Sequence, residues 1–211
     1  MTSILLIPLF LLTADEPRWE LSTQDTGVKI YARKRADSEI REMKAMGLLE
    51  ATPQEIWKAV RDLEHYPSTM PYTEEAKVLS REPEDKVILF YSKINTPMVD
   101  RRDYIIRLVD ESDWKEGKGF YKVSWTVVND KDELAPVKPD VVRVRVNDGY
   151  WLLEPREEGK RTFVTYYIYT APGGSIPTFI ANQGNTIAVP KVFDAVRKTI
   201  AAERAQASKA K

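Results

Sequence analysis

The sequence predicts an α+β domain in which one curved antiparallel β-sheet wraps around a long C-terminal α-helix. Three observations lead to this fold class. Short alternating strands fill most of the chain, one capped helix interrupts them after residue 52, and a long apolar segment follows the last strand. Antiparallel sheets commonly bury one face, and a terminal helix is an economical cover for it. A chain of 211 residues is long enough for one such domain with a sizeable core.

The N-terminus carries a continuous apolar run, residues 4–12, that is too short to span a bilayer as a helix. A polar segment follows it, as in a secretory signal peptide, although no Lys or Arg precedes the run. We predict a signal peptide over residues 1–16 and a periplasmic or extracellular protein. An uncleaved membrane anchor and a cytoplasmic protein are the alternatives. The domain then covers residues 17–205, and residues 206–211 form a polar tail.

The first strands are predicted at residues 28–32 and 40–50, where apolar and polar residues alternate. A helix follows at once. Thr52-Pro53-Gln54-Glu55 is a capping box with proline at the first helical position. Apolar residues keep helical spacing as far as Leu63, and Pro67 closes the segment.

After this helix the strand pattern returns and continues almost to the C-terminal helix. The clearest strand places Tyr121, Val123, Trp125 and Val127 on one face, opposite polar residues. Gly, Pro, Asn and Asp clusters separate the segments, as turns require. The predicted strands are 87–94, 100–110, 119–128, 141–146, 149–154 and 161–170.

The C-terminal helix begins near Pro177, after a turn at Pro172-Gly173-Gly174-Ser175. Its apolar residues form a stripe that would close the sheet. Asn182, Gly184 and Pro190 weaken its middle, since glycine costs about 1 kcal/mol and interior proline about 3 kcal/mol relative to alanine. We interpret this as a helix that must bend; the alternative is that Pro190 marks a kink or a second helical segment.

Composition excludes several classes of function. Lys+Arg and Asp+Glu both total 32, so the chain lacks the basic excess with which nucleic-acid proteins neutralise phosphates. The absence of cysteine excludes disulfides, thiolate nucleophiles and Cys-based metal sites. One histidine, His65, is too few for a multi-histidine metal centre, and it lies at a helix end where a surface role is typical. We therefore predict no nucleic-acid partner, no metal and no cofactor.

The strand over residues 100–110 carries the first candidate site residue. Strand alternation places Arg102, Tyr104, Ile106 and Leu108 on one face and Arg107 on the other. Arg102 then projects onto a mainly apolar surface, where an arginine is costly unless a carboxylate or phosphate meets its guanidinium. The alternative is that it lies at the strand end and pairs with a neighbouring acid or with water.

A similar pattern at Val141-Val142-Arg143-Val144-Arg145-Val146 has a simpler interpretation. Arg143 and Arg145 share one face opposite the valines. We interpret them as the solvated face of a half-exposed sheet.

Three stretches make the chain resemble a START domain, the lipid-transfer family named after the steroidogenic acute regulatory protein, in a single-domain bacterial form. A proline-containing loop enters an Arg-Asp-aromatic strand at Thr96-Pro97-Met98-Val99-Asp100-Arg101-Arg102-Asp103-Tyr104. The second is Gly149-Tyr150-Trp151-Leu152-Leu153-Glu154-Pro155. The third runs from Thr165-Tyr166-Tyr167 through the Pro172-Gly173-Gly174-Ser175-Ile176-Pro177 turn into the terminal helix. The resemblance covers residues 17–205.

The resemblance implies a helix-grip fold with an internal hydrophobic tunnel for one lipid-like molecule, closed by the terminal helix and the loop at residues 95–100. In phospholipid-binding members the arginine of the Arg-Asp pair reaches the headgroup phosphate, which corresponds to Arg102 here. Sterol-binding members often carry a further inward arginine, where this chain has Leu108, so a phospholipid is favoured over a sterol. The candidate ligand-binding residues are Arg102, Tyr104, Met98, Tyr91, Trp125, Tyr167, Phe179, Asn182 and Gln183.

The favoured function is non-catalytic binding of one lipid-like ligand, with transfer between membranes. The partners would be the ligand and a transient membrane surface, and the protein would act as a monomer. An aromatic polyketide cyclase of the wider superfamily is one alternative, because such an enzyme needs only a shaped cavity and one or two acid–base groups. A sensor that reports a hydrophobic ligand to a partner protein is the other.

Overall fold

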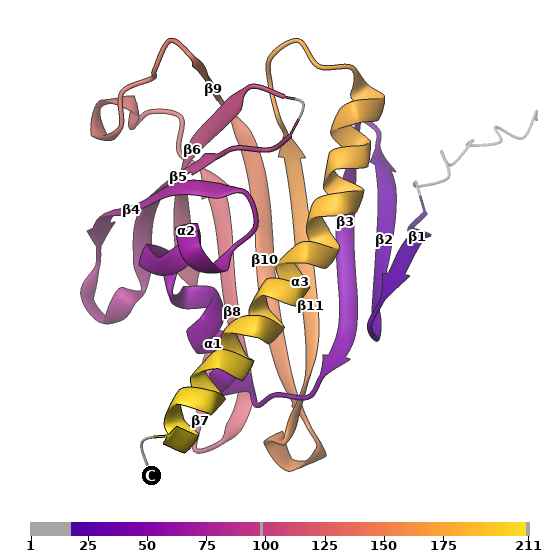
Figure 1. The fold of residues 1–211 in the computed structure, drawn as a ribbon, viewed down its shortest axis with the longest axis vertical. Helices are drawn as coiled ribbons and strands as arrows, with labels where there is room; N and C mark the ends of the chain where they lie inside the picture. The colour runs from indigo at the N-terminus through magenta and orange to yellow at the C-terminus, as the bar shows by residue number, and fades with distance from the viewer. Residues whose placement is uncertain (1–17, 98, 210–211) are drawn as a thin grey trace, which may run out of the picture.

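The computed structural model describes residues 18–97 and 99–209. The predicted signal peptide and Met98 lie outside the described residues. The strands form one strongly curved sheet in the order β1-β2-β3-β11-β10-β8-β6-β5-β4, with β7 paired to β8 and β9 paired to β6 (Figure 1). Every pairing is antiparallel except that of β6 with β9. The predicted helix-grip fold class is confirmed.

The elements follow in chain order. The strands are β1 (Glu20–Asp25), β2 (Val28–Arg35), β3 (Ser38–Leu49), β4 (Thr73–Arg81), β5 (Val87–Ile94), β6 (Arg101–Asp110), β7 (Asp113–Lys115), β8 (Lys118–Val127), β9 (Val141–Arg143), β10 (Val146–Arg156) and β11 (Arg161–Ala171). The helices are α1 (Pro53–Arg61), α2 (Tyr66–Thr69) and α3 (Thr178–Lys209). Short 3₁₀ turns occupy Leu63–His65, Pro83–Asp85, Asp132–Leu134 and Glu157–Gly159.

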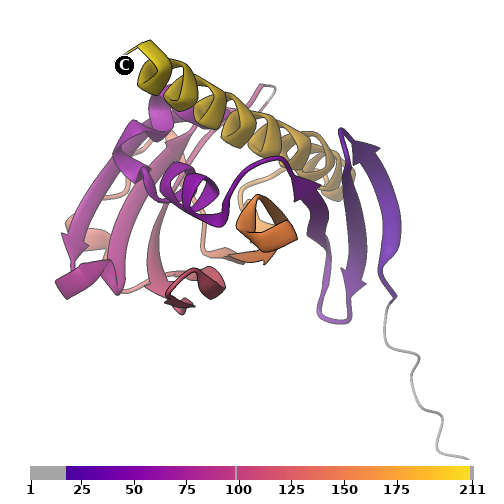
Figure 2. The ribbon, with the colours of Figure 1, turned by 90° about the horizontal axis from the view of Figure 1, so that it is seen from below.

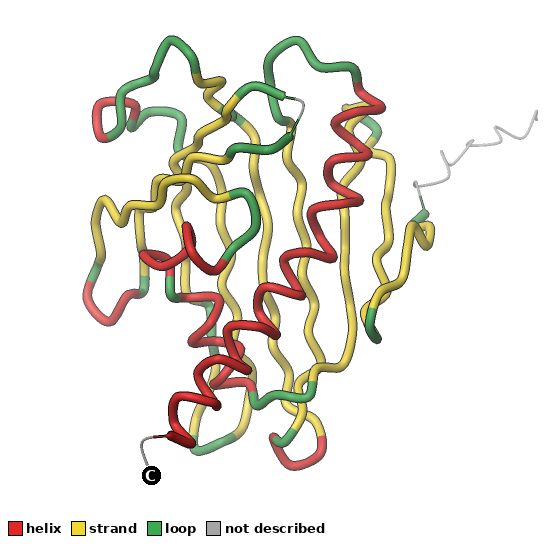
Figure 3. Tube along the Cα trace, viewed as in Figure 1, coloured by secondary structure: helices red, strands yellow, loops and turns green. Residues whose placement is uncertain are grey.

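Helix α3 lies diagonally across the concave face of the sheet, with α1 and α2 beside its C-terminal half (Figures 1 and 3). Seen from below, the sheet bends around the helix on both sides (Figure 2). The helices therefore form one layer on the inner face, and the core lies between that layer and the strands. No helix within the described part of the chain is both long and apolar enough to cross a membrane.

A well-buried part of the core lies beneath the C-terminal half of α3. Phe193 is buried against Trp151 and Tyr166, with ring centroids 5.4 and 6.2 Å away. Val196 and Ile200 continue the buried stripe along the helix. Burying one such side chain contributes about 1.5–3 kcal/mol, so this half of α3 is anchored by packing.

The predicted start of the first helix is confirmed. Thr52 caps α1: its side-chain oxygen accepts from the Glu55 N–H at 3.3 Å, and the Glu55 carboxylate accepts from the Thr52 N–H at 2.8 Å. Pro53 occupies the first turn. The sequence pattern thus locates this boundary because the capping contacts are local.

Other elements differ from the prediction. Strands β1 and β4 were not predicted, because register shifts within both pairings break their alternation. The expected strand at residues 141–146 is divided into β9 and the first residue of β10. Helix α3 continues through Pro190 to Lys209 as one helix, so no second helical segment begins at Pro190 and the expected polar tail is helical as far as the described residues extend.

Candidate ligand-binding site

A cavity of about 440 Å³ lies between α3 and the concave face of the sheet. Its wall is mainly aliphatic and aromatic, with contributions from β6, β8, β10, β11, the segment after α2 and the loop that precedes β6. Residues of α3 from Ile180 to Val192 form the opposite wall. Among the described residues that line the cavity, Arg102 is the one charged side chain.

Strand β6 supplies four successive inward side chains to the cavity. Arg102, Tyr104, Ile106 and Leu108 all line it, whereas Arg107 is exposed on the other face. The strand parity predicted from the sequence is therefore confirmed. Because β6 is an interior strand, with β5 on one side and β8 and β9 on the other, its inward residues are held at fixed depth.

The Arg102 guanidinium is held by backbone carbonyls rather than by an acid. Its Nε donates to the Pro172 carbonyl at 3.2 Å, and its Nη1 donates to the Asp100 carbonyl. The Nη2 atom is buried and has no hydrogen-bond partner in the part of the chain that the structure describes. Burial lowers the pKa of Arg102, and the Asp100 charge partly opposes this shift. No carboxylate of the described residues pairs with it, so the expected alternative of a neighbouring acid is wrong.

The turn after β11 covers this guanidinium. Gly174 has a φ of +68°, and a Cβ placed on it would lie 3.6 Å from Arg102 Nη2 and 3.4 Å from a methyl of Val142. The positive φ favours glycine at this position. The turn therefore lies directly over the unpaired nitrogen, so movement of this turn would open a path to Arg102.

Asn147 is a second polar residue at the same end of the cavity. It is 4% exposed, and its Oδ1 accepts from Trp125 Nε1 at 3.1 Å and from the Thr170 hydroxyl at 3.2 Å. Its Nδ2 has no partner among the described residues. Gly149 permits this contact, because a Cβ there would lie 2.3 Å from the Trp125 ring. The sequence prediction missed Asn147, although its alternation with Gly149 and Trp151 along β10 could have indicated an inward position.

Three tyrosines line the interior of the cavity: Tyr166 is buried, and Tyr66 and Tyr104 are half-buried. Burial raises the pKa of Tyr66, Tyr104 and Tyr166 above the ordinary value, so all three stay neutral at physiological pH. Tyr66 donates to the Val60 carbonyl at 2.7 Å. The Tyr166 hydroxyl has no hydrogen-bond partner within the described residues, so it is available to a ligand. The interior thus combines apolar surface with neutral hydroxyl groups.

The family model for polyketide cyclase/dehydrase and lipid transport proteins matches residues 49–197. The chain belongs to this family. An uncharacterized protein of Pseudomonas aeruginosa is 30% identical over 169 residues, which are 78% of each chain. The crystal structure of a STAR-related lipid transfer protein from Xanthomonas axonopodis superimposes with a TM-score of 0.75 and 26% identity, covering 86% of this chain and 98% of that one. Human StAR-related lipid transfer protein 5 has the same fold, with a TM-score of 0.77 and 15% identity over 88% of each chain.

Within this START-like chain, four predicted site residues line the cavity: Arg102, Tyr104, Trp125 and Gln183. The first three come from the sheet. Gln183 lies on α3 and is exposed, so it belongs to the rim rather than the interior. That these residues contact a ligand stays a prediction. Met98 lies outside the described residues.

Two predicted tyrosines lie on the outer face of the sheet. Tyr91 is buried beneath the segment around Leu134, and its hydroxyl donates to Asp103 at 3.2 Å. Tyr167 stacks on Tyr150, and its hydroxyl donates to Glu42 at 2.6 Å. Their positions at the cavity were predicted wrongly, because burial and aromatic character do not reveal which face of a strand is inward.

The two remaining predicted residues lie on α3 but do not line the cavity. Phe179 is 69% exposed, so its expected inner-face position is wrong and Ile180 occupies the cavity side instead. Asn182 joins α3 to the edge of β3: its Oδ1 accepts from the Arg41 N–H at 2.8 Å and its Nδ2 donates to the Glu39 carbonyl at 3.2 Å. Asn182 therefore holds the helix to the sheet.

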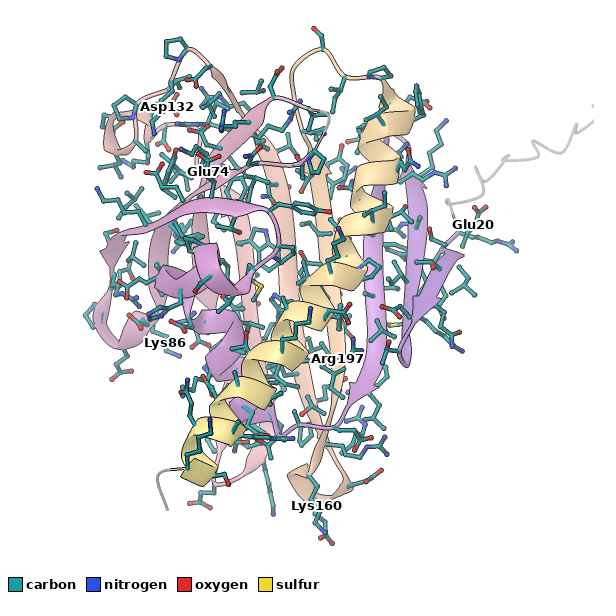
Figure 4. The ribbon with its side chains drawn as sticks, in the orientation of Figure 1. Glu20, Glu74, Lys86, Asp132, Lys160 and Arg197 are labelled. Atoms are coloured by element: carbon teal, nitrogen blue, oxygen red, sulfur yellow. The ribbon has the colours of Figure 1, made fainter. Side chains whose placement is uncertain are left out.

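The outer face behind Arg102 carries a buried ion pair. Arg143 donates from Nε and Nη2 to the two carboxylate oxygens of Asp103, at 2.7 and 3.0 Å, and also contacts Asp132. Asp132 lies in the segment that precedes β9, at the opposite end of the molecule from the C-terminal end of α3 (Figure 4). The expectation of a solvated Arg143 is wrong, since it is 8% exposed, whereas Arg145 is exposed as expected. The hydrogen bond to Asp103 raises the pKa of Arg143.

Proposed function

We propose that this protein binds one lipid-like amphiphile in the cavity, without catalysis, and transfers it between membranes. The anionic oxygens of the headgroup would bind Arg102. The observation that carries the proposal is the buried guanidinium of Arg102, the one charged group among the described residues that line this mainly apolar cavity, with one nitrogen that none of them pairs. A buried charge in such surroundings is costly unless an opposite charge meets it.

The size and character of the cavity support an amphiphile. Its volume of about 440 Å³ is within the range of about 300–1,000 Å³ that small-molecule sites occupy. Apolar ligand surface buried there contributes about 25 cal/mol per Å² to binding. The Leu108 position offers no second inward cation, which favours a ligand with one anionic head, such as a phospholipid, over a sterol held by two arginines.

The chemistry of the lining supports a carrier more than a cyclase. A general acid or base works best with a pKa near the operating pH. No Asp, Glu, His, Lys or Cys is found among the described lining residues. The tyrosines have pKa values raised by burial, so they can donate hydrogen bonds but are poor bases. These groups suit recognition of a ligand's polar atoms.

Transfer requires the cavity to open. The N-terminal half of α3 covers it, and the loop that precedes β6 forms the adjacent rim. We infer that ligand enters when these two segments separate at a membrane surface, a gating motion rather than a chemical step.

The test is ligand binding by the wild-type protein and the Arg102→Leu variant. We expect native mass spectrometry to find co-purified lipid in the wild type. Affinity for a dodecyl phosphate probe should fall about tenfold to a hundredfold in Arg102→Leu, the effect of losing hydrogen bonds to a charged group worth about 1.5–3 kcal/mol. Arg107→Leu is the matched control, because it removes an arginine from the exposed face of the same strand.

Binding should be unchanged in Arg107→Leu, and both variants should unfold at temperatures near that of the wild type. If neither co-purified lipid nor probe binding is detected in the wild type, and lipid does not pass between vesicles, the carrier function is wrong. Equal affinity in Arg102→Leu would restrict Arg102 to holding the loops around it.

A further inference from the structure

The end of the cavity at Arg102 also contains the Asn147 amide, whose N–H groups donate to no described residue. Arg102 donates to the Pro172 carbonyl, and Asn147 accepts from Thr170, two residues earlier on the same chain segment. Both side chains line the cavity and are less than a tenth exposed. The guanidinium and the amide therefore lie at the same end of the cavity, near the end of β11.

The orientation of the Asn147 amide follows from its partners. The Trp125 indole Nε1–H can only donate a hydrogen bond. The atom that it contacts at 3.1 Å must therefore be the amide oxygen, which also accepts the Thr170 hydroxyl. This arrangement assigns the NH₂ group to the opposite side, where no group of the described chain accepts from it. Because Asn147 lines the cavity, this NH₂ group is free to donate to a ligand.

The charge pattern at this end favours an anion. Two side chains offer unused N–H donors, and no carboxylate is found among the described lining residues. An anionic head with several oxygens could accept from both side chains. A zwitterionic head would bring an ammonium group that finds no opposite charge in the cavity.

We propose that Asn147 is a specificity-determining residue that, with Arg102, makes the cavity select amphiphiles with an anionic carboxylate or phosphate head over zwitterionic or cationic ones. This inference rests on the proposed function, since it narrows the ligand class of the same site. It assigns to Asn147 a direct hydrogen bond to the ligand. The packing of Trp125 over Gly149 holds that amide in place.

The experiment compares probes that share one dodecyl chain and differ in the head: dodecanoate, dodecyl phosphate, dodecylphosphocholine, dodecylamine and dodecanol. Affinities are measured by calorimetry below the concentration at which each probe forms micelles. We expect the wild type to bind dodecanoate or dodecyl phosphate at least tenfold more tightly than dodecylphosphocholine and dodecylamine. The tighter of the two anions identifies the head as carboxylate or phosphate.

The decisive variant is Asn147→Asp. It keeps an oxygen for Trp125 and Thr170 but replaces the NH₂ donors with an acceptor, so anion affinity should fall at least tenfold while dodecanol affinity changes little. Thr170→Val is the control, because it removes one hydrogen bond to the amide oxygen and leaves the NH₂ group in place; it should keep the anion preference. Asn147→Leu tests the same loss without an added charge, in case the aspartate variant does not fold.

The outcomes separate the two proposals. If dodecanol and the anions all fail to bind, the proposed function fails and this inference fails with it. If all probes bind with equal affinity, or dodecylphosphocholine binds as tightly as the anions, the cavity is a carrier site without the selectivity proposed here. Unchanged anion affinity in both Asn147 variants, or an equal loss in Thr170→Val, would reduce Asn147 to a structural role.

Discussion

The two halves of α3 perform different tasks although they belong to one continuous helix. Residues 189–200 place Val189, Phe193, Val196 and Ile200 in the core. In residues 178–188, Ala181 is the one buried residue, and Phe179 and Ile187 are exposed. The helix is therefore anchored by packing along its C-terminal half and covers the cavity with its N-terminal half.

Polar contacts, rather than packing, hold the covering half. The Asn182 amide bonds the backbone of β3 on one side of the helix. Near the junction of the halves, the Lys191 ammonium lies 4.8 Å from the centre of the Tyr72 ring and bonds its hydroxyl. Exposed contacts of this kind are worth about 0.5–1 kcal/mol each. The cover can therefore separate from the sheet at much lower cost than the anchor.

The largest expected effect is on the anchored half. Phe193→Ala removes a fully buried ring, so we expect the free energy of unfolding to fall by about 3–5 kcal/mol. Ile180→Ala in the covering half is the matched truncation and should cost less than about 1 kcal/mol. Urea denaturation measures both. Equal losses would contradict the division of the helix into anchor and cover.

Amide hydrogen exchange should also differ between the two halves of α3. Amides of residues 182–188 should exchange at least about tenfold faster than those of residues 192–200, a difference of about 1.4 kcal/mol in opening free energy. Gly184 has no neighbour that a Cβ would touch, and Pro190 cannot donate to the Thr186 carbonyl. Uniform protection along α3 would contradict the bending helix inferred from the sequence.

The smallest expected effect concerns the hydrogen bonds between the C-terminal end of α3 and α1. Arg204 donates two hydrogen bonds to the Glu55 carboxylate, at 2.6 and 2.8 Å, and these bonds, with those from Thr52, lower the pKa of Glu55 from 4.5 to about 2. Because the pKa of Glu55 is lower in the folded state, its ionised carboxylate stabilises the fold above about pH 4.5, and this contribution disappears as the pH falls toward 2. Glu55→Gln should lose about 1 kcal/mol at pH 7.

Denaturation at several pH values checks this prediction, and the difference between Glu55→Gln and the wild type should shrink as the solution becomes acidic. Glu203→Gln is the control, since Glu203 pairs with Lys58 across the same two helices at 3.1 Å, through one contact to a largely exposed lysine. It should change stability by no more than about 0.5 kcal/mol. A constant difference across the pH range would show that the carboxylate charge is not the cause.

The sequence correctly predicted those parts of the fold and the site that depend on residues close together in the chain. Strand parity placed Arg102 and Leu108 on the inner face, and the capping box located the start of α1, because both follow from local geometry. The prediction from sequence failed where the contact that positions a residue joins residues far apart in the chain. Asn147 depends on Trp125, which lies 22 residues away, and nothing near Tyr91 indicates that the segment around Leu134 covers it.

The same limit explains the error on α3. The apolar pattern correctly predicted a helix, but Phe179 and Ile180 are adjacent and both apolar. Which of the two faces the cavity depends on the angle at which the helix crosses the sheet. That angle is set by packing around Phe193 and by the hydrogen bonds of Asn182. The bond from Asn182 to Arg41 connects residues more than 100 positions apart in the chain. No local pattern contains this information.

The adjacency of Arg102 and Asp103 has a consequence for folding. Neighbouring residues of a strand point to opposite faces, so a slip of β6 by one residue would put a carboxylate inside the cavity and the guanidinium outside. The polarity of the binding site would then be inverted. The bidentate ion pair between Asp103 and Arg143 forms only in the observed register of β6. An ion pair that never meets the ligand thereby helps to determine the sign of the charge that the ligand encounters.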